Sequence, residues 1–590
     1  MKERGVALLR DIRSLIVRAP KSPLAWILFA AFVLHVIGIG WGLPGSDAWE
    51  DDGIAPRDFL TGTYETYRPG HYFTYPPVHL LGLTVLTSPV WGLAIARAPS
   101  LSRADVIASV IQVPTMTVLT VVARLVSEMM ALGIIYFLAK LAEEVWGRRA
   151  ALLVAIVLTI NAPLTYYAHT SNLDVPYNFW ACFALLEMAR AMVRREPRRL
   201  RRAILFAALA VGTKDQAYAI FLVGFPLAIA AWLFLDREVR ARRGEILKHV
   251  AIGLAIAGAL FLLISGAVTN PSGFRARIGF LLGPASQDHA HYAPTWAGRA
   301  EIVKAVGLMF PVFYPWPLAA AALLGVVHHV ARLRKTPEKL VAGLLPMFAA
   351  LSFLIAFNFT ARRTEHRFSL PEMLMLGVYI GVGLDALLAF CRSEIQRRIV
   401  SIVMVVPMVW GLFQAASVDA MLILDPRYDA EAWLRANVRE GDTIETYGAN
   451  AYQPRFPEKA RVSRVDVSPL DARNPLPDVT EQQAPFADIE SRKPRFIVVP
   501  VAWSWRWFAE APLPGHVVPP EQARRQRDEP TRIFFHGLGG PLSPYRVARE
   551  STYSSTFWPR YDIHSSTGKE VLIFERREPR IEPRTEPRTP

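Results

Sequence analysis

Long apolar runs separated by short polar connections make up the first 420 residues of the chain. An apolar helix of about 20 residues is long enough to cross the roughly 30 Å hydrocarbon layer of a membrane. The pattern therefore predicts an all-α polytopic membrane domain over residues 24–420. The runs that predict its spans are 24–43, 119–140, 150–168, 174–193, 248–268, 306–327, 340–359, 371–390 and 399–418.

Two further apolar stretches do not fit a single span. The stretch 203–235 is too long and is interrupted by the polar residues 212–216, so we expect a tight turn between two short helices. The stretch 78–96 follows Tyr75-Pro76-Pro77. It either crosses the membrane together with 107–118 or lies along the outer face. The whole pattern predicts about eleven transmembrane helices.

The connections between the runs alternate in charge. Six lysines and arginines precede the first run, which predicts that residues 1–23 form a basic cytoplasmic N-terminus. A cleaved signal peptide is the alternative, but the run is long and no small-residue cleavage site follows it. Basic clusters then recur in every second connection, which predicts an extracytoplasmic C-terminus in the plasma (inner) membrane. The basic connections are 148–149, 194–202, 237–248, 332–339 and 392–398, and the opposite ones are 44–77, 169–174, 212–217, 269–303 and 360–370.

The sequence becomes mixed polar and apolar after residue 420. This change predicts a small α/β domain outside the membrane over residues 421–577, while residues 578–590 repeat Glu-Pro-Arg and are expected to be a disordered tail. We expect a helix at 429–437 and strands at 496–499, 533–535 and 571–574, and we assign 44–118 to the first outer loop.

Composition and charge agree with a membrane protein. Hydrophobic residues make up 52% of the 590 residues and the mean hydropathy is +0.23, which excludes a disordered or purely soluble chain. The net charge of +15 comes from arginines in connections between apolar runs, so it does not indicate a nucleic-acid-binding stripe. The two cysteines, Cys182 and Cys391, are too few for a disulfide framework or a metal knot.

The first candidate site is the acidic loop after the first run. Glu50, Asp51 and Asp52 are consecutive, and three carboxylates held near a membrane surface repel one another. We expect some of them to have a raised pKa, to pair with Arg57, or to bind a divalent cation. A solvated acidic loop is the alternative.

Two further candidates lie in short connections on the same side. Asp174 begins the predicted span 174–193, so it is either a helix N-cap or a site residue, and His169 is either a site residue or a hydrogen-bonded interfacial histidine. Lys214 lies in the turn at 212–216. It either forms a structural pair with Asp215 or points into a cavity, where its ammonium would hold a phosphate.

The fourth candidate is the segment 362–371, which carries three arginines on a side where positive charge is otherwise sparse. Arginine suits bidentate binding of a phosphate, and the headgroup of a polyprenyl phosphate lies at this depth. Arg363 and Arg367 are four residues apart, so they would share a face if the segment were helical.

These motifs, taken in order, resemble a known family. Asp51-Asp52 with Ala55 and Tyr75-Pro76-Pro77 resembles the first-loop signature of the GT-C superfamily of membrane glycosyltransferases. The segment 172–176, the turn 212–215 and the segment 366–371 are similar to three later landmarks. The resemblance covers about residues 25–420 and is to the family 39, protein O-mannosyltransferase-like branch with its aminoarabinose transferase relatives. The family pair is usually Asp-Glu, and Asp52 departs from it.

The resemblance implies an inverting hexosyl- or pentosyltransferase. Such an enzyme moves a sugar from a polyprenyl-phosphate-linked donor to an acceptor hydroxyl of a protein, lipid or glycan on the outer face of the membrane. Asp51 matches the catalytic base, and Asp52 would position the acceptor or a metal. Whether a divalent cation is a cofactor stays open, with Asp52 and Asp174 as its candidate ligands. The substrate-binding residues that this implies are His169, Asp174, Lys214, Arg363, His366 and Arg367.

Two other classes of protein remain open from the sequence. One is a non-catalytic transporter of polyprenyl lipids or glycans, which inverted repeats would favour. The other is a sensor or scaffold whose outer domain binds a partner. The glycosyltransferase hypothesis predicts that Asp51 or Asp52 shares one outward-facing cavity with Asp174 and His169, opposite Lys214 or the arginines of 362–367.

Overall fold

The structure is a computed structural model. It describes residues 22–50, 52–334, 336–470, 473–474, 476–504, 507, 516–561, 563–564 and 567–577. The predicted tail, all but the last two residues of the predicted N-terminus, and Asp51 lie outside these residues. The chain forms two compact units, which we call the membrane unit and the sheet unit. The membrane unit contains residues 1–423 and two returning segments, 512–520 and 557–564, and the sheet unit contains 424–511, 521–556 and 565–590.

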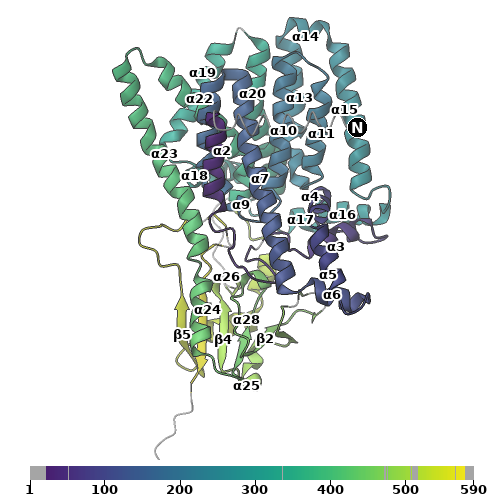
Figure 1. The fold of residues 1–590 in the computed structure, drawn as a ribbon, viewed down its shortest axis with the longest axis vertical. Helices are drawn as coiled ribbons and strands as arrows, with labels where there is room; N and C mark the ends of the chain where they lie inside the picture. The colour runs from purple at the N-terminus through teal and green to yellow at the C-terminus, as the bar shows by residue number, and fades with distance from the viewer. Residues whose placement is uncertain are drawn as a thin grey trace, which may run out of the picture. The chain divides into compact units, whose positions relative to one another are not determined.

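The membrane unit is helical throughout (Figure 1). Its helices are α2 (Pro23–Val36), α3 (Asp58–Tyr67), α4 (Val78–Leu86), α5 (Ser88–Ala96), α6 (Arg103–Val110), α7 (Val113–Trp146), α8 (Arg148–Thr159), α9 (Ala162–Ala168), α10 (Asp174–Val193), α11 (Arg199–Val211), η2 (Asp215–Ala217), α12 (Tyr218–Leu222), α13 (Gly224–Leu235), α14 (Arg237–Ala241), α15 (Arg243–Ile264), α16 (Pro271–Leu282), α17 (Pro284–Gln287), α18 (Trp296–Phe313), α19 (Pro317–Leu333), α20 (Pro337–Phe353), η3 (Leu354–Asn358), α21 (Phe359–Ala361), α22 (His366–Phe390) and α23 (Glu394–Ile423).

Among the described residues, six helices are long and apolar enough to cross a membrane, or nine if each of three bent helix pairs is one span. The bent pairs are α4 with α5, α8 with α9, and α18 with α19. The predicted polytopic helical membrane domain is confirmed, and the chain is a multi-pass membrane protein. Three predicted spans fall on helices outside this set: α2 has 14 residues, α11 has 13, and α10 includes Asp174, Glu187 and Arg190.

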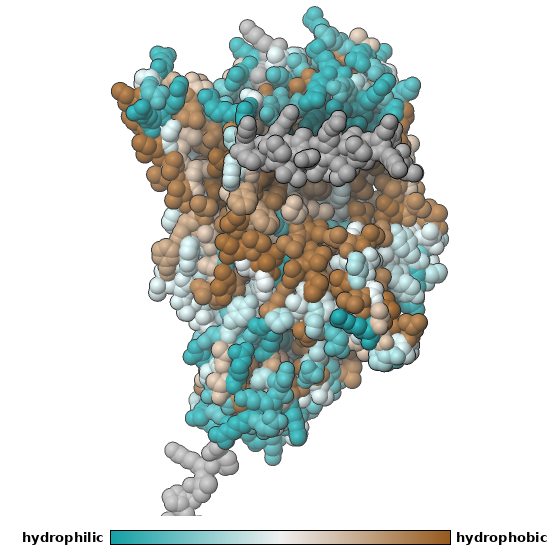
Figure 2. Space-filling view, viewed as in Figure 1, coloured by the Kyte–Doolittle hydropathy of each residue, from teal (hydrophilic) through white to brown (hydrophobic). Residues whose placement is uncertain are grey.

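Both irregular apolar stretches have helical counterparts. The stretch 203–235 breaks between α11 and η2, at the predicted polar turn. The stretch 78–96 is the pair α4 and α5, bent by 56° into either a broken span or a re-entrant loop. Apolar side chains form a band over the visible face of the helices, and hydrophilic residues cover the end of the bundle that carries α14 (Figure 2).

Close helix packing in the membrane unit depends on small residues. A Cβ atom added to Gly383 of α22 would lie 1.8 Å from the carbonyl oxygen of Ala321 in α19. A Cβ atom added to Gly325 of α19 would lie 2.0 Å from the carbonyl oxygen of Tyr379 in α22. Small residues at such crossings let helix backbones approach within a membrane, where the hydrophobic effect does not drive helices together.

The sheet unit is an α/β domain around one six-stranded sheet with the order β3-β2-β1-β4-β6-β5. Strands β1 to β4 pair in parallel, and β6 pairs antiparallel with β4 and β5. Its elements are α24 (Pro426–Asn437), β1 (Thr443–Thr446), η4 (Asn450–Tyr452), β2 (Arg461–Asp466), β3 (Val479–Gln483), η6 (Phe486–Asp488), α25 (Ile489–Arg492), β4 (Phe496–Pro500), α26 (Val501–Ser504), α27 (Pro520–Gln526), α28 (Glu529–Gly537), β5 (Tyr545–Ser551) and β6 (Val571–Arg576).

One predicted strand of this unit is wrong. Residues 533–535 lie inside the helix α28, whereas the helix at 429–437 and the strands at 496–499 and 571–574 are found as predicted. The side chain of Asp528 accepts hydrogen bonds from the backbone N–H and the hydroxyl of Thr531, which caps the helix. Phe534 and Phe535 then pack on the aromatic core of the sheet unit, so a short apolar run reflects a helix face here.

Candidate active site

The acidic loop after α2 is held by buried partners. Arg124 of α7 donates from Nη2 to Glu50 Oε2 at 2.9 Å, and Nη1 of the same guanidinium donates to the carbonyl of Trp41 at 2.8 Å. The backbone N–H of Ser171 donates to Glu50 Oε1 at 2.8 Å. Asn172 Nδ2 donates to the carbonyl oxygen of Asp52 at 3.3 Å. The loop is therefore fixed to α7 and to the segment before α10, and it is not a solvated acidic loop.

Asp52 contacts the side chains of Arg367 and His564. Its Oδ2 lies 2.5 Å from Nη1 of Arg367 and 2.9 Å from Nε2 of His564. Burial alone would raise the pKa of Asp52, but Arg367 and His564 outweigh burial and hold the pKa well below its ordinary value. Arg57, which was an expected partner of these carboxylates, lies 2.9 Å from Asp47 instead. Asp52 is consequently an ionised group whose position is set by its partners.

Arg363 and Arg367 converge on one aromatic ring. Their guanidinium carbons lie 4.4 and 4.6 Å from the ring centroid of Phe368. The two arginines do not share a helix face, because Arg362 adopts a left-handed conformation with φ of 53° and α22 begins only at His366, so Arg363 is not helical. Stacking on Phe368 brings the two cations together instead.

The two cations differ in their partners. Arg367 contacts Asp52 and also lies 3.0 Å from Glu365. Arg363 contacts no carboxylate in the described part of the chain, and its buried Nε has no hydrogen-bond partner there. Burial lowers the pKa of Arg363, and the neighbouring Arg367 lowers it further. An arginine in this state has unused donors for an anion.

Asp174 and Lys214 form a second charged pair. Lys214 Nζ lies 2.7 Å from Asp174 Oδ1, and Gln216 Nε2 donates to the same oxygen at 3.3 Å. The N-cap alternative for Asp174 is wrong, because Leu173 is the N-cap of α10 and no side-chain cap bond is formed. The alternative pair of Lys214 with Asp215 is also wrong, because Asp215 pairs with Arg277. Burial lowers the pKa of Lys214, although Asp174 opposes the shift.

The pKa of the Tyr75 phenol is shifted by charges from both the Asp52 group and the Asp174 group. Its pKa is raised to about 12, first by burial and then by the carboxylates of Asp52 and Asp174, while Arg367 and Arg363 oppose the shift. Charges this close to one phenol lie in one neighbourhood. The structure therefore gathers residues from three loops and the start of α22 that are up to about 300 positions apart in sequence.

Two expected site residues are placed differently. His169 is fully buried, with Nδ1 2.7 Å from the carbonyl of Thr165 and Nε2 against the carbonyl of Ile37 and 3.5 Å from Asp419. Burial lowers the pKa of His169 to about 4. Both ring nitrogens are engaged inside the helix bundle, so His169 does not share an opening with Asp52, contrary to our expectation. His366 is half-buried, with its ring 6.3 Å from that of Phe313.

Sequence reasoning missed His564. It lies in the returning segment 557–564 of the membrane unit, which we had assigned to the outer domain. Its ring stacks on Tyr166 of α9 at 5.4 Å with an interplanar angle of 20°. The aromatic pair Phe557-Trp558 could have indicated that this segment belongs to the membrane unit, because such aromatic residues favour the membrane–water interface.

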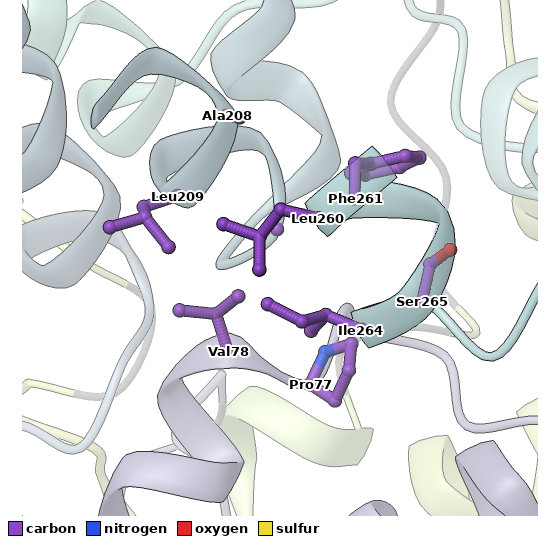
Figure 3. A pocket seen from close by; sticks show the side chains of 9 residues that line it. Pro77, Val78, Ala208, Leu209, Leu260, Phe261, Ile264 and Ser265 are labelled. Carbon is purple, nitrogen blue, oxygen red and sulfur yellow. The ribbon is translucent and has the colours of Figure 1, made fainter. Parts of the chain in front are cut away.

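A narrow apolar hollow lies beside the Lys214 turn (Figure 3). The side chains of Val78, Leu209, Leu260 and Ile264 point toward one another around it. The hollow is lined by residues at the start of α4, the end of α11 and the end of α15, which are Pro77, Val78, Ala208, Leu209, Gly212, Leu260, Phe261, Ile264 and Ser265. It is therefore not the predicted cavity shared by Asp52, Asp174 and His169.

The described residues contain no group of three or more His, Cys, Asp and Glu side chains that could hold a metal ion. The two candidate ligands are also engaged by cations, Asp52 by Arg367 and Asp174 by Lys214. We therefore base no step on a bound metal.

No family model and no curated protein matches the sequence. Solved structures match most of it. The oligosaccharyltransferase of Archaeoglobus fulgidus in complex with Zn and sulfate is 13% identical, covering 93% of this chain and 88% of its own, with a TM-score of 0.46. ArnT of Cupriavidus metallidurans bound to undecaprenyl phosphate is 14% identical, covering 93% and 97%, with a TM-score of 0.47. A. fulgidus AglB with an inhibitory peptide and a dolichol-phosphate is 12% identical, covering 94% and 89%, with a TM-score of 0.46. These proteins are GT-C glycosyltransferases, the superfamily that the sequence motifs resemble.

Proposed function

We propose that this protein is an inverting glycosyltransferase. It moves a sugar from a polyprenyl-phosphate-linked donor to an acceptor hydroxyl on the outer face of the membrane. The observation that carries the proposal is the half-buried Arg363 side chain, whose Nε is buried and which lies beside the Asp52–Arg367 pair without a carboxylate of its own in the described residues. A buried cation without an anion is costly unless a ligand supplies the anion.

The cations suit the leaving group of this reaction. As the bond between the anomeric carbon and the phosphate oxygen breaks, negative charge develops on the departing polyprenyl phosphate. Arg363 and Arg367 stack on the same ring, so both guanidinium groups can approach one phosphate with charge-assisted hydrogen bonds. Lys214 adds a third cation in the same neighbourhood.

The carboxylates suit the acceptor. The acceptor oxygen attacks the anomeric carbon from the face opposite the phosphate, and its proton passes to a carboxylate. Asp51 matches this base by the sequence resemblance. Asp52 has a strongly lowered pKa and is a weak base, so it fits the role of orienting Arg367 and the acceptor hydroxyl.

The hollow beside the Lys214 turn suits the lipid part of the donor. Its walls are almost entirely apolar, and Gly212 in its lining is two residues from Lys214.

Donor affinity tests the proposed phosphate site. The dissociation constant of a short-chain polyprenyl phosphate is measured by equilibrium dialysis for the purified protein and for Arg363→Gln and Arg367→Gln. Loss of one charge-assisted contact costs about 1.5–3 kcal/mol, so affinity should fall roughly ten- to a hundredfold in each variant.

Arg362→Gln is the matched control, because Arg362 donates from Nη1 to the carbonyl of Tyr292 and is not stacked on Phe368. It should bind within about twofold of the unaltered protein. If both Arg363→Gln and Arg367→Gln bind normally, the phosphate assignment is wrong.

A further inference from the structure

The returning segment 557–564 packs onto the membrane unit along α23 and α9. The Trp558 ring stacks on Phe413 of α23, with centroids 5.2 Å apart and an interplanar angle of 20°. The backbone N–H of Tyr561 lies 3.2 Å from Sδ of Met421, also in α23. Ile563 is buried. The segment is thus anchored through Trp558, Tyr561 and Ile563. These contacts fix the position of His564, which follows Ile563 directly.

The imidazole of His564 is oriented by an aromatic neighbour. Tyr166 stacks on the ring, and its hydroxyl lies 3.2 Å from Nδ1, while Tyr167 meets the ring edge-on at 6.2 Å. If the Tyr166 hydroxyl donates to Nδ1, the hydrogen of the neutral imidazole is on Nε2. Nε2 then donates to Oδ2 of Asp52 at 2.9 Å.

His564 and Arg367 bind the same oxygen of Asp52. Arginine usually meets a carboxylate through a fork of two parallel hydrogen bonds to both oxygens. Here Arg367 reaches Oδ2 through Nη1, and His564 reaches Oδ2 from its own segment. Two donors on one oxygen fix the rotation of the carboxylate and direct Oδ1 away from both of them. Asp52 is one-third exposed, which leaves room for a hydroxyl group to approach.

We propose that His564 is a positioning residue for glycosyl transfer. Its Nε2–H sets the rotation of the Asp52 carboxylate, so that Oδ1 accepts a hydrogen bond from the acceptor hydroxyl during attack. The active site is therefore completed by the C-terminal returning segment. This inference rests on the proposed transferase function. It adds His564, which lies outside the predicted membrane domain of residues 24–420, to the active site.

The test compares His564→Ala with His564→Gln in a turnover assay of the full-length protein. The assay follows release of polyprenyl phosphate from a short-chain polyprenyl-phosphate sugar, with an acceptor extract from the membranes of the expression host. His564→Ala should lower kcat about ten- to a hundredfold and leave the donor dissociation constant unchanged. The Gln amide can donate from nearly the same position as Nε2, so His564→Gln should recover most of kcat.

Two further variants separate positioning from folding. On an Asp52→Asn background, His564→Ala should have little additional effect, because the group that it positions has been altered. His516→Ala is the matched control, since His516 lies in the other returning segment and packs on Tyr292 at 4.6 Å. It should keep normal kcat.

The outcomes distinguish this inference from the function on which it rests. If the unaltered protein turns over donor and His564→Ala does so equally well, His564 has no positioning role although the transferase stands. Equal losses for His564→Ala and His564→Gln, or additive losses with Asp52→Asn, also overturn the inference. Absence of turnover in the unaltered protein contradicts the proposed function and this inference with it.

Discussion

At the scale of single residues, Asp174 and Lys214 form a buried ion pair. Both residues are buried, and the two charged groups lie 2.7 Å apart. Desolvation of two charges offsets much of their attraction, so such a pair adds little net stability while it is intact. Removal of one partner is different, because the remaining charge stays buried without compensation.

This asymmetry predicts the stability of three variants. Asp174→Asn and Lys214→Met should each lower the free energy of unfolding by about 3–5 kcal/mol. The double variant should recover most of that loss, as measured by thermal unfolding in detergent. If Lys214 also binds donor phosphate, the double variant should be stable but weak in donor binding. Equal stability of all three variants would mean that the pair does not form.

The types of the site residues and their order along the chain could be predicted from the sequence, but the side chains that they contact could not. The sequence predicted that the Asp51-Asp52 carboxylates lie across a cavity from the arginines of 362–367, whereas Asp52 contacts Arg367 directly. One of the two alternatives for Lys214 was a pair with its neighbour Asp215, whereas the actual partner is Asp174, 40 positions earlier. His169 was assigned to the site from its position in a short loop, yet its side chain turns into the bundle. Side-chain direction depends on tertiary packing, which a single sequence does not record.

At the scale of elements, the crossing of α19 and α22 depends on the absence of side chains. Gly383 and Gly325 each lie against a backbone carbonyl of the other helix. A backbone atom cannot rotate away as a flexible side chain can. Any added carbon must therefore push the two helices apart.

Gly383→Ala should destabilise the protein by about 1–3 kcal/mol or more, because of this overpacking. Gly258→Ala in α15 is the control, because a Cβ atom there meets nothing within 4 Å. That variant should be neutral or stabilised by up to about 1 kcal/mol, since glycine is a poor helix former. Thermal unfolding of both variants in one detergent measures the contrast. A Gly383→Ala protein as stable as Gly258→Ala would show that the helices do not cross this closely.

Elements with a long, regular pattern were predicted well, and short ones were not. Most apolar runs near 20 residues fall on long helices, because the membrane sets their length and composition, but the predicted spans 150–168 and 306–327 each break into a bent helix pair. The run 533–535 is too short for its periodicity to distinguish a strand from one face of a helix. The Asp528 side chain caps the N-terminus of α28 and so favours the helix. The split of 78–96 into α4 and α5 comes with a bend of 56° that hydropathy does not encode.

At the scale of the whole molecule, the charge pattern predicts sidedness. Arginine clusters mark the cytoplasmic connections, so Ser393 between α22 and α23 should face the cytoplasm and the sheet unit should lie outside. Ser491 in α25 is exposed and is therefore a suitable labelling position in the sheet unit.

With both native cysteines removed, a membrane-impermeant thiol reagent should label Ser491→Cys in intact cells. Ser393→Cys should react only after permeabilisation. The reverse pattern would contradict the orientation and place the candidate site on the wrong side for an extracytoplasmic acceptor.

The central claim is that the cluster around Asp52, Arg363 and Arg367 breaks the bond between a sugar and polyprenyl phosphate. The most direct measurement reconstitutes the purified protein in vesicles with pentosyl and hexosyl short-chain polyprenyl phosphates and an acceptor extract, and quantifies released polyprenyl phosphate. We predict release with at least one donor and a loss of about a hundredfold or more in Asp51→Asn, which removes the expected base. Movement of intact donor across the vesicle membrane without release of polyprenyl phosphate from any donor would contradict the account and identify a transporter.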